Sequence, residues 1–137
     1  MITPHTLSDL DKAYLALRDT LVNLSNCLLH SADETEIVGM FVACEEIALK
    51  LFHDEESAMT ASECPALEIN QRGHQKFLQT LSNLLHEYRI AHSGMPLANR
   101  ARIELTVWLH EHHRVVDGQL ANHLRRKTLP TLADPVG

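Results

Sequence analysis

The sequence predicts an all-α fold, an antiparallel up-and-down four-helix bundle. Two observations predict it: apolar residues recur at alternating spacings of three and four along four long segments, and short stretches that favour turns or helix starts separate those segments. The chain has 137 residues, of which 45% are hydrophobic, which suffices for one domain with a core. We therefore expect one bundle over residues 1–127 and a C-terminal tail over residues 128–137.

The first two segments carry apolar stripes with helical spacing. The first stripe comprises Leu7, Leu10, Tyr14, Leu17, Leu21, Leu24 and Leu28. The second comprises Ile37, Phe41, Cys44, Ala48, Leu51, Glu55 and Met59. Between them Ser31 stands three residues before Glu34, a capping-box pattern that opens a helix.

The last two segments are bounded by proline and glycine. Pro65 suits the first position of a third helix, whereas Gly94 and Pro96 end that helix and allow a fourth. The third stripe comprises Leu67, Asn70, His74, Phe77, Leu81, Leu84 and Tyr88. The fourth comprises Ala101, Leu105, Trp108, His112, Val115 and Val116. Because the connections are short, successive helices are expected to be antiparallel neighbours.

Charge and cysteine usage limit the classes of partner and compartment. The formal net charge of −6 argues against a nucleic-acid partner, since that affinity needs clustered Lys and Arg. Cys27, Cys44 and Cys64 lie far apart and do not suggest a disulfide framework, which fits a reducing compartment. We expect neither a leader nor a membrane-spanning helix, since the N-terminal residues do not have a charged segment followed by an apolar run and no apolar stretch approaches about 20 residues. We expect a cytoplasmic protein without a membrane partner.

Five polar residues occupy positions on the predicted buried stripes: Tyr14, Glu55, Asn70, His74 and His112. Burying a lone carboxylate or imidazole is costly unless the group is paired or coordinated. In an antiparallel bundle all five fall near the same end. Histidine and carboxylate side chains from facing helices at one level are how helix bundles build metal sites. The stripes therefore predict a metal site inside the bundle.

The histidines of the fourth segment are expected to point in different directions. His112 continues the stripe inward, whereas His110 lies about 200° around the helix and should face solvent. His113, about 100° away, should lie on the flank. Asp117 is about 140° from His112 in a regular helix and reaches the same site only where the helix is widened, as in a π-bulge.

Two motifs that contain these residues resemble those of the hemerythrins, specifically the single-domain bacterial kind. The family's fourth-helix signature, Trp-Leu, His and Asp, is matched in full by Trp108-Leu109, His112 and Asp117. The second-helix signature, His-Phe, Glu-Glu and Met, appears as Leu51-Phe52, Glu55-Glu56 and Met59. In this second motif a leucine replaces the leading histidine.

Two further motifs extend the resemblance over nearly the whole chain. The third-helix signature of proline, two histidines and phenylalanine appears as Pro65, Asn70, His74 and Phe77. Asparagine therefore replaces the first histidine. The first-helix signature has a histidine three residues after an Ile-Asp pair, and here Tyr14 follows Leu10-Asp11 at that spacing.

The resemblance implies an incomplete diiron site. In the family, five histidines hold two irons, two carboxylates bridge them, and one iron binds dioxygen reversibly. Carried over by position, the carboxylates are Glu55 and Asp117. Two of the three histidines of one iron are His74 and His112, with Asn70 in the third place. Both histidines of the other iron are replaced, one by Tyr14 and one by a leucine.

The incomplete set leads us to expect at most one strongly held metal ion. Two histidines with carboxylates suit Fe(II), Mn(II) or Zn(II), and the resemblance favours iron. The leading hypothesis is a protein that binds or senses dioxygen, nitric oxide or the metal itself. One alternative is a metal-free structural or interaction bundle, in which His74 and His112 form hydrogen bonds directly with Glu55 and Asp117. Another alternative, with less support, is a non-haem iron oxidative enzyme. The sequence leaves the oligomeric state open, with a homodimer among the alternatives.

Overall fold

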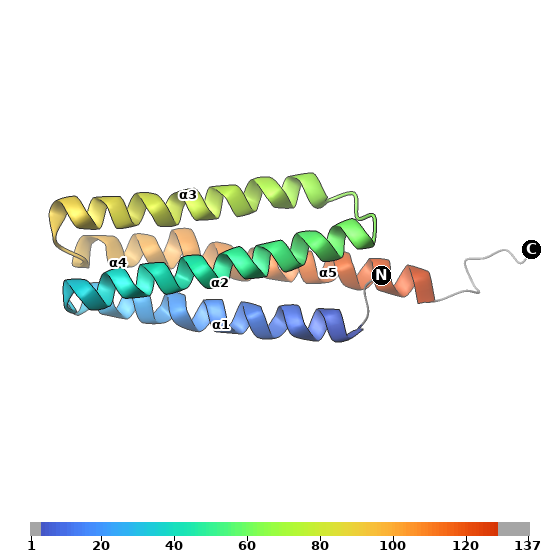
Figure 1. The fold of residues 1–137 in the computed structure, drawn as a ribbon, viewed down its shortest axis with the longest axis horizontal. Coiled ribbons are helices and arrows are strands. Elements are labelled where there is room, and N and C mark those ends of the chain that lie inside the picture. The colour runs from blue at the N-terminus through green and yellow to red at the C-terminus, as the bar shows by residue number, and fades with distance from the viewer. Residues whose placement is uncertain (1–3, 129–137) are drawn as a thin grey trace, which may run out of the picture.

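Four helical rods lie side by side in the computed structural model, which describes residues 4–128 (Figure 1). They are α1 (Pro4–Leu29), α2 (Glu34–Ala61), α3 (Leu67–Ala91) and a fourth rod made of α4 (Met95–Ala101), the π-helical segment η1 (Arg102–Val107) and α5 (Trp108–Thr128). The α1–α2 and α3–α4 connections lie at one end in Figure 1, and the α2–α3 connection lies at the other. The prediction of an all-α four-helix fold is confirmed.

Two expectations concern the ends of the chain and its relation to membranes. Thr128 ends α5, and the rest of the tail expected over 128–137 lies outside the described residues. Within residues 4–128, every helix is too short or too polar to cross a bilayer.

The first three apolar stripes form the core as predicted. The second stripe is buried from Ile37 to Met59, and the third is buried from Asn70 to Tyr88. On α1 the buried stripe extends from Leu10 to Leu28. Cys44 belongs to this core, and burial raises the pKa of its thiol to about 12. The thiol therefore stays protonated and acts as a small apolar side chain.

The fourth stripe is partly wrong, because the fourth rod is widened at η1. Beyond η1 the buried positions are Leu109, His113, Val116 and Leu120, whereas Val115 is 45% exposed. A π-helical turn contains more residues than an α-helical turn. The inward line of α5 is therefore displaced by about one residue from the positions that α-helical periodicity predicts.

The starts of α2 and α3 differ from the predictions. The N-cap of α2 is Asp33 and has no side-chain capping bond, while Ser31 has a φ of 53° in the preceding turn. Ser31 therefore does not form the expected capping box. Pro65 precedes α3, whose N-cap is Ala66, so the proline is not the first helical residue.

The start of α4 agrees with the prediction and shows why glycine is needed there. Gly94 is the N-cap and a proline follows in the first turn. A Cβ atom at Gly94 would lie 2.8 Å from Cδ2 and 2.9 Å from the carbonyl oxygen of Leu28. The turn between α3 and α4 thus packs against the end of α1 too closely for any larger residue.

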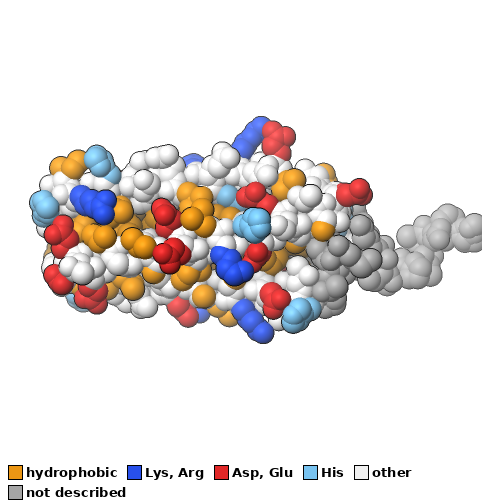
Figure 2. Space-filling model, in the orientation of Figure 1, with side chains coloured by type: hydrophobic (Ala, Val, Ile, Leu, Met, Phe, Trp, Pro, Cys, Tyr) orange, Lys and Arg blue, Asp and Glu red, His pale blue; other side chains and the backbone are white. Residues whose placement is uncertain are grey.

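Charged side chains are interspersed on the face of the bundle seen in Figure 2. Several form exposed pairs along one helix, such as Lys50 with Asp54 at 2.9 Å, and Arg100 joins Glu87 to Glu104. Exposed pairs of this kind contribute at most about 1 kcal/mol each. Burial of the apolar stripes is therefore the main source of stability for the fold.

Candidate metal centre

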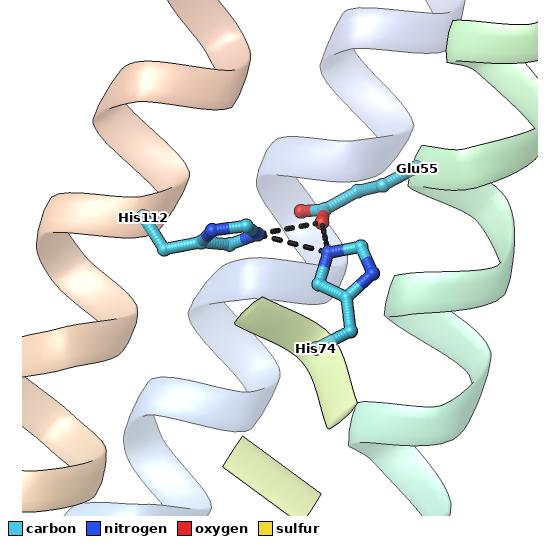
Figure 3. Close-up of side chains that lie close together, drawn as sticks. All are labelled: Glu55, His74 and His112. Atoms are coloured by element: carbon cyan, nitrogen blue, oxygen red, sulfur yellow. Dashed lines mark hydrogen bonds and ion pairs between the residues drawn. The ribbon is translucent and has the colours of Figure 1, made fainter. Parts of the chain in front are cut away.

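Three polar residues of the predicted stripes meet inside the bundle. Glu55 on α2, His74 on α3 and His112 on α5 point toward one another (Figure 3). One ligand atom from each lies within 4.8 Å of the other two. Nε2 of His74 and Nε2 of His112 lie 2.8 and 3.1 Å from Oε1 of Glu55, and 2.9 Å from each other. We call these three residues the inner cluster.

The spacing of the three donor atoms fits a metal ion. Ligands about 2.1 Å from a metal and about 90° apart are separated by about 3.0 Å. Six ligands at these angles form an octahedron around the metal. The three observed separations of 2.8, 2.9 and 3.1 Å match those expected on one triangular face of that octahedron. Two histidines and one carboxylate on one face form the arrangement that non-haem iron proteins use.

The hydrogen bond on the far side of His74 also favours a cation. Nδ1 of His74 donates to Oε2 of Glu56 at 2.6 Å. A proton held at Nδ1 leaves the lone pair of Nε2 facing the inner cluster. The 2.8 Å contact between Nε2 and Oε1 of Glu55 is a hydrogen bond, which needs a proton between the two atoms. A metal ion could take the place of that proton.

Glu55 is an ionised carboxylate with one oxygen unused. Burial has the largest influence on its pKa and would raise it, but hydrogen bonds and charges from His112 and His74 together outweigh burial and lower the pKa. Its Oε2 atom is buried and has no hydrogen-bond partner among residues 4–128. A buried anionic oxygen without a partner is costly. A metal ion at the inner cluster would offset that cost.

Aromatic side chains fix the planes of both imidazole rings. Phe52 stacks on His74 with ring centroids 4.1 Å apart, and Trp108 stacks on His112 at 4.5 Å. Phe77 packs edge-on against Phe52 and also contacts Trp108. These contacts restrict the rings, and Phe52 and His74 also line a surface pocket on the outer side of His74.

Tyr14 is buried as expected but is not part of the inner cluster. Its hydroxyl group is hydrogen-bonded to Nδ1 of His110 at 3.1 Å, and its ring stacks on His113 at 4.0 Å. His113 in turn donates from Nε2 to Asp11 at 3.1 Å. The phenol therefore contacts His110 across the α1–α5 interface. The side chain of His110 is exposed, as predicted.

Asn70 and Asp117 also lie outside the inner cluster. The amide of Asn70 donates to the carbonyl of Ala66 at 2.9 Å and to Gln119 at 3.1 Å. Asp117 is exposed because α5 is a regular helix beyond Trp108 and the widened segment η1 lies before His112. The structure thus brings together Glu55, His74 and His112 and leaves Tyr14, Asn70 and Asp117 apart from them.

Three residues next to the predicted site were missed by sequence reasoning. Glu56 had a usable signal, because a residue one position from a stripe lies on the flank that meets a neighbouring helix. Phe52 follows a stripe position in the same way. His113 had the same signal and was expected on the flank, but that it is only 9% exposed depends on the position of η1.

Comparison with known proteins does not extend these findings. No family model, curated protein or solved structure matches the chain significantly. The hemerythrin resemblance therefore rests on the sequence motifs and stays a prediction.

Proposed function

We propose that this chain is a hemerythrin-like protein that holds one non-haem metal ion and uses it to bind or sense dioxygen or nitric oxide. Iron is favoured over manganese or zinc, because two histidines and one carboxylate on one face suit Fe(II) and leave positions open for a ligand. The observation that carries the proposal is the convergence of Glu55, His74 and His112.

The burial of the donor atoms supports a small, uncharged ligand. The side chains of Glu55, His74 and His112 are only 0%, 2% and 7% exposed. A diatomic gas can reach such atoms through packing fluctuations, whereas a larger substrate needs an open pocket. The same burial gives an oxidative enzyme that acts on larger molecules less support.

Each residue of the site would have a distinct role. A bound metal would supply the electrophilic centre that takes the gas. His74 and His112 would provide nitrogen donors, and Glu55 would provide the anionic oxygen that neutralises part of the metal charge. Phe52 and Trp108 would keep the two imidazole rings in place through the stacking described above.

Metal content tests the proposal directly. The protein is purified without a histidine tag, treated with a mild chelator, reconstituted with Fe(II) and measured by elemental analysis. We expect about one metal ion per chain and a change in the absorption spectrum when nitric oxide is added. About two ions per chain would mean that further donors complete a diiron centre. No bound metal would overturn the proposal.

A metal-free structural bundle is the second candidate. The direct contacts of Glu55 with His74 and His112 favour it, since a closed polar network can join three helices without a metal. Thermal melting separates the two candidates, because a ligand that binds only the folded state raises its stability. If the protein melts at the same temperature after addition of Fe(II) as it does after chelation, the result would support the structural bundle.

A further inference from the structure

We propose that Glu56 positions His74 for metal binding by holding a proton at Nδ1 and so directing Nε2 toward Glu55 and His112. The inference rests on the proposed function. Its basis is the hydrogen bond of 2.6 Å from Nδ1 of His74 to Oε2 of Glu56. A histidine that ligates a metal through one nitrogen needs a partner at the other nitrogen to fix its tautomer and orientation.

Glu56 is itself held in place by α3. The amide of Gln71 donates to Oε1 of Glu56 at 3.3 Å, while His74 donates to Oε2. Gln71 and His74 are three residues apart and lie on one face of α3. The carboxylate of Glu56 therefore connects two adjacent turns of α3 to α2.

The adjacent glutamates have separate tasks because consecutive helix residues point about 100° apart. Glu55 is completely buried in the inner cluster, whereas the side chain of Glu56 is 31% exposed on the outer side of His74. Glu56 also borders a surface pocket with His53 and Gln75. Only Glu55 is placed to ligate a metal, and Glu56 acts through His74.

The stacking of His74 on Phe52 cannot replace this hydrogen bond. The two rings are 4.1 Å apart and within 5° of parallel, which fixes the plane of the imidazole. A rotation of 180° about the last side-chain bond keeps that plane but exchanges nitrogen and carbon positions. The hydrogen bond to Glu56 distinguishes the two orientations, and only one of them places Nε2 in the inner cluster.

The test uses variants of Glu56 and a matched control on the same helix. Glu56→Ala removes the acceptor, and Glu56→Leu does so with less loss of volume should the first variant fail to fold. Glu56→Gln retains a carbonyl acceptor and should restore part of the effect. Glu45→Gln is the control, because Glu45 is exposed on α2 and its substitution removes the same charge.

The first readout needs no metal. Nitrogen-15 NMR of the imidazole of His74 in metal-free protein should show a proton at Nδ1 in the wild type and in Glu45→Gln. Glu56→Ala or Glu56→Leu should shift the ring toward the other tautomer. A merely structural role for Glu56 would not change the tautomer. An unchanged His74 spectrum in both of these variants would overturn the inference, whether or not the protein binds metal.

The second readout is the affinity for Fe(II) under anaerobic conditions. Loss of the partner of a ligating histidine typically weakens metal binding by about 10 to 100-fold, and we expect that loss in Glu56→Ala. The loss should be smaller in Glu56→Gln and absent in Glu45→Gln. Wild-type affinity in Glu56→Ala would overturn the inference and leave the proposed function intact. A wild type that binds no metal would overturn the proposed function, while the NMR result would still decide whether Glu56 orients His74.

Discussion

The helix α5 gives adjacent histidines to two different polar regions. His112 joins the inner cluster between α2, α3 and α5, while His113 joins a group at the α1–α5 interface. We call this second group the outer cluster; its members are Asp11, Tyr14, His110 and His113. A difference of one residue, about 100° around the helix, separates the two destinations.

The two clusters contain similar chemical groups in different arrangements. In the inner cluster the donor atoms of three residues approach one another. Each cluster has one buried atom without a hydrogen-bond partner among the described residues, Oε2 of Glu55 in the inner cluster and Nδ1 of His113 in the outer cluster. In the outer cluster the hydrogen bonds lead outward, to Asp11, which is 58% exposed, and to the exposed His110. Convergence of donor atoms, and not the number of histidines, therefore marks the candidate metal site.

Substitution of the two adjacent histidines should give the largest difference between the clusters. His112→Ala removes a ligand and should lower affinity for Fe(II) by more than about 100-fold, beyond the effect of losing an outer partner. His113→Ala should leave metal content unchanged. Elemental analysis after reconstitution measures both, and equal losses in the two variants would contradict the separation of the clusters.

The second largest difference between the clusters should be in the stability of the metal-free protein. His74→Ala takes one of two partners from the buried carboxylate of Glu55, and we expect a loss of about 1–3 kcal/mol in the free energy of unfolding. Asp11→Ala removes an exposed partner of His113 and should cost at most about 1 kcal/mol. Urea denaturation gives both values. A larger loss of stability for Asp11→Ala than for His74→Ala would show that the outer cluster contributes more to the stability of the fold than the inner cluster does.

Tyr14→Phe tests whether the phenol takes part in the inner cluster. The substitution keeps the ring that stacks on His113 and removes only the hydrogen bond to His110. We expect a loss of about 0.5–1.5 kcal/mol in stability, with metal content and spectrum equal to those of the wild type. A changed spectrum of the iron-loaded protein would place Tyr14 at the metal.

Asp117→Asn should have the smallest effect. Asp117 is exposed, and surface substitutions of this kind change stability by about 0.5 kcal/mol or less. Metal affinity should equal that of the wild type. A clear loss of affinity would mean that α5 rearranges around the metal and brings the carboxylate inward.

Part of the candidate site follows from local periodicity in the sequence. Glu55 and His74 lie on α2 and α3, which are regular helices throughout, so counting along each stripe predicts that both side chains are buried. His112 points to the same place because it is close to the inward line of α5 despite the widening at η1. The exposure of Asp117 agrees with its position about 140° from His112 in a regular helix. Its expected place among the ligands came from the family resemblance, and the widened turn that could have brought it inward lies before His112.

The four helices, the buried stripes of the first three and the burial of Glu55 and His74 could be predicted from the sequence, because these features depend on the spacing of apolar residues within one helix. The burial of His113 against Tyr14 and the exposure of Asp117 depend on the packing of the helices. The hydrogen bond between Glu56 of α2 and His74 of α3 depends on that packing as well. The sequence of one segment does not specify these features, because the placement of η1 and the contacts between helices depend on how distant segments pack.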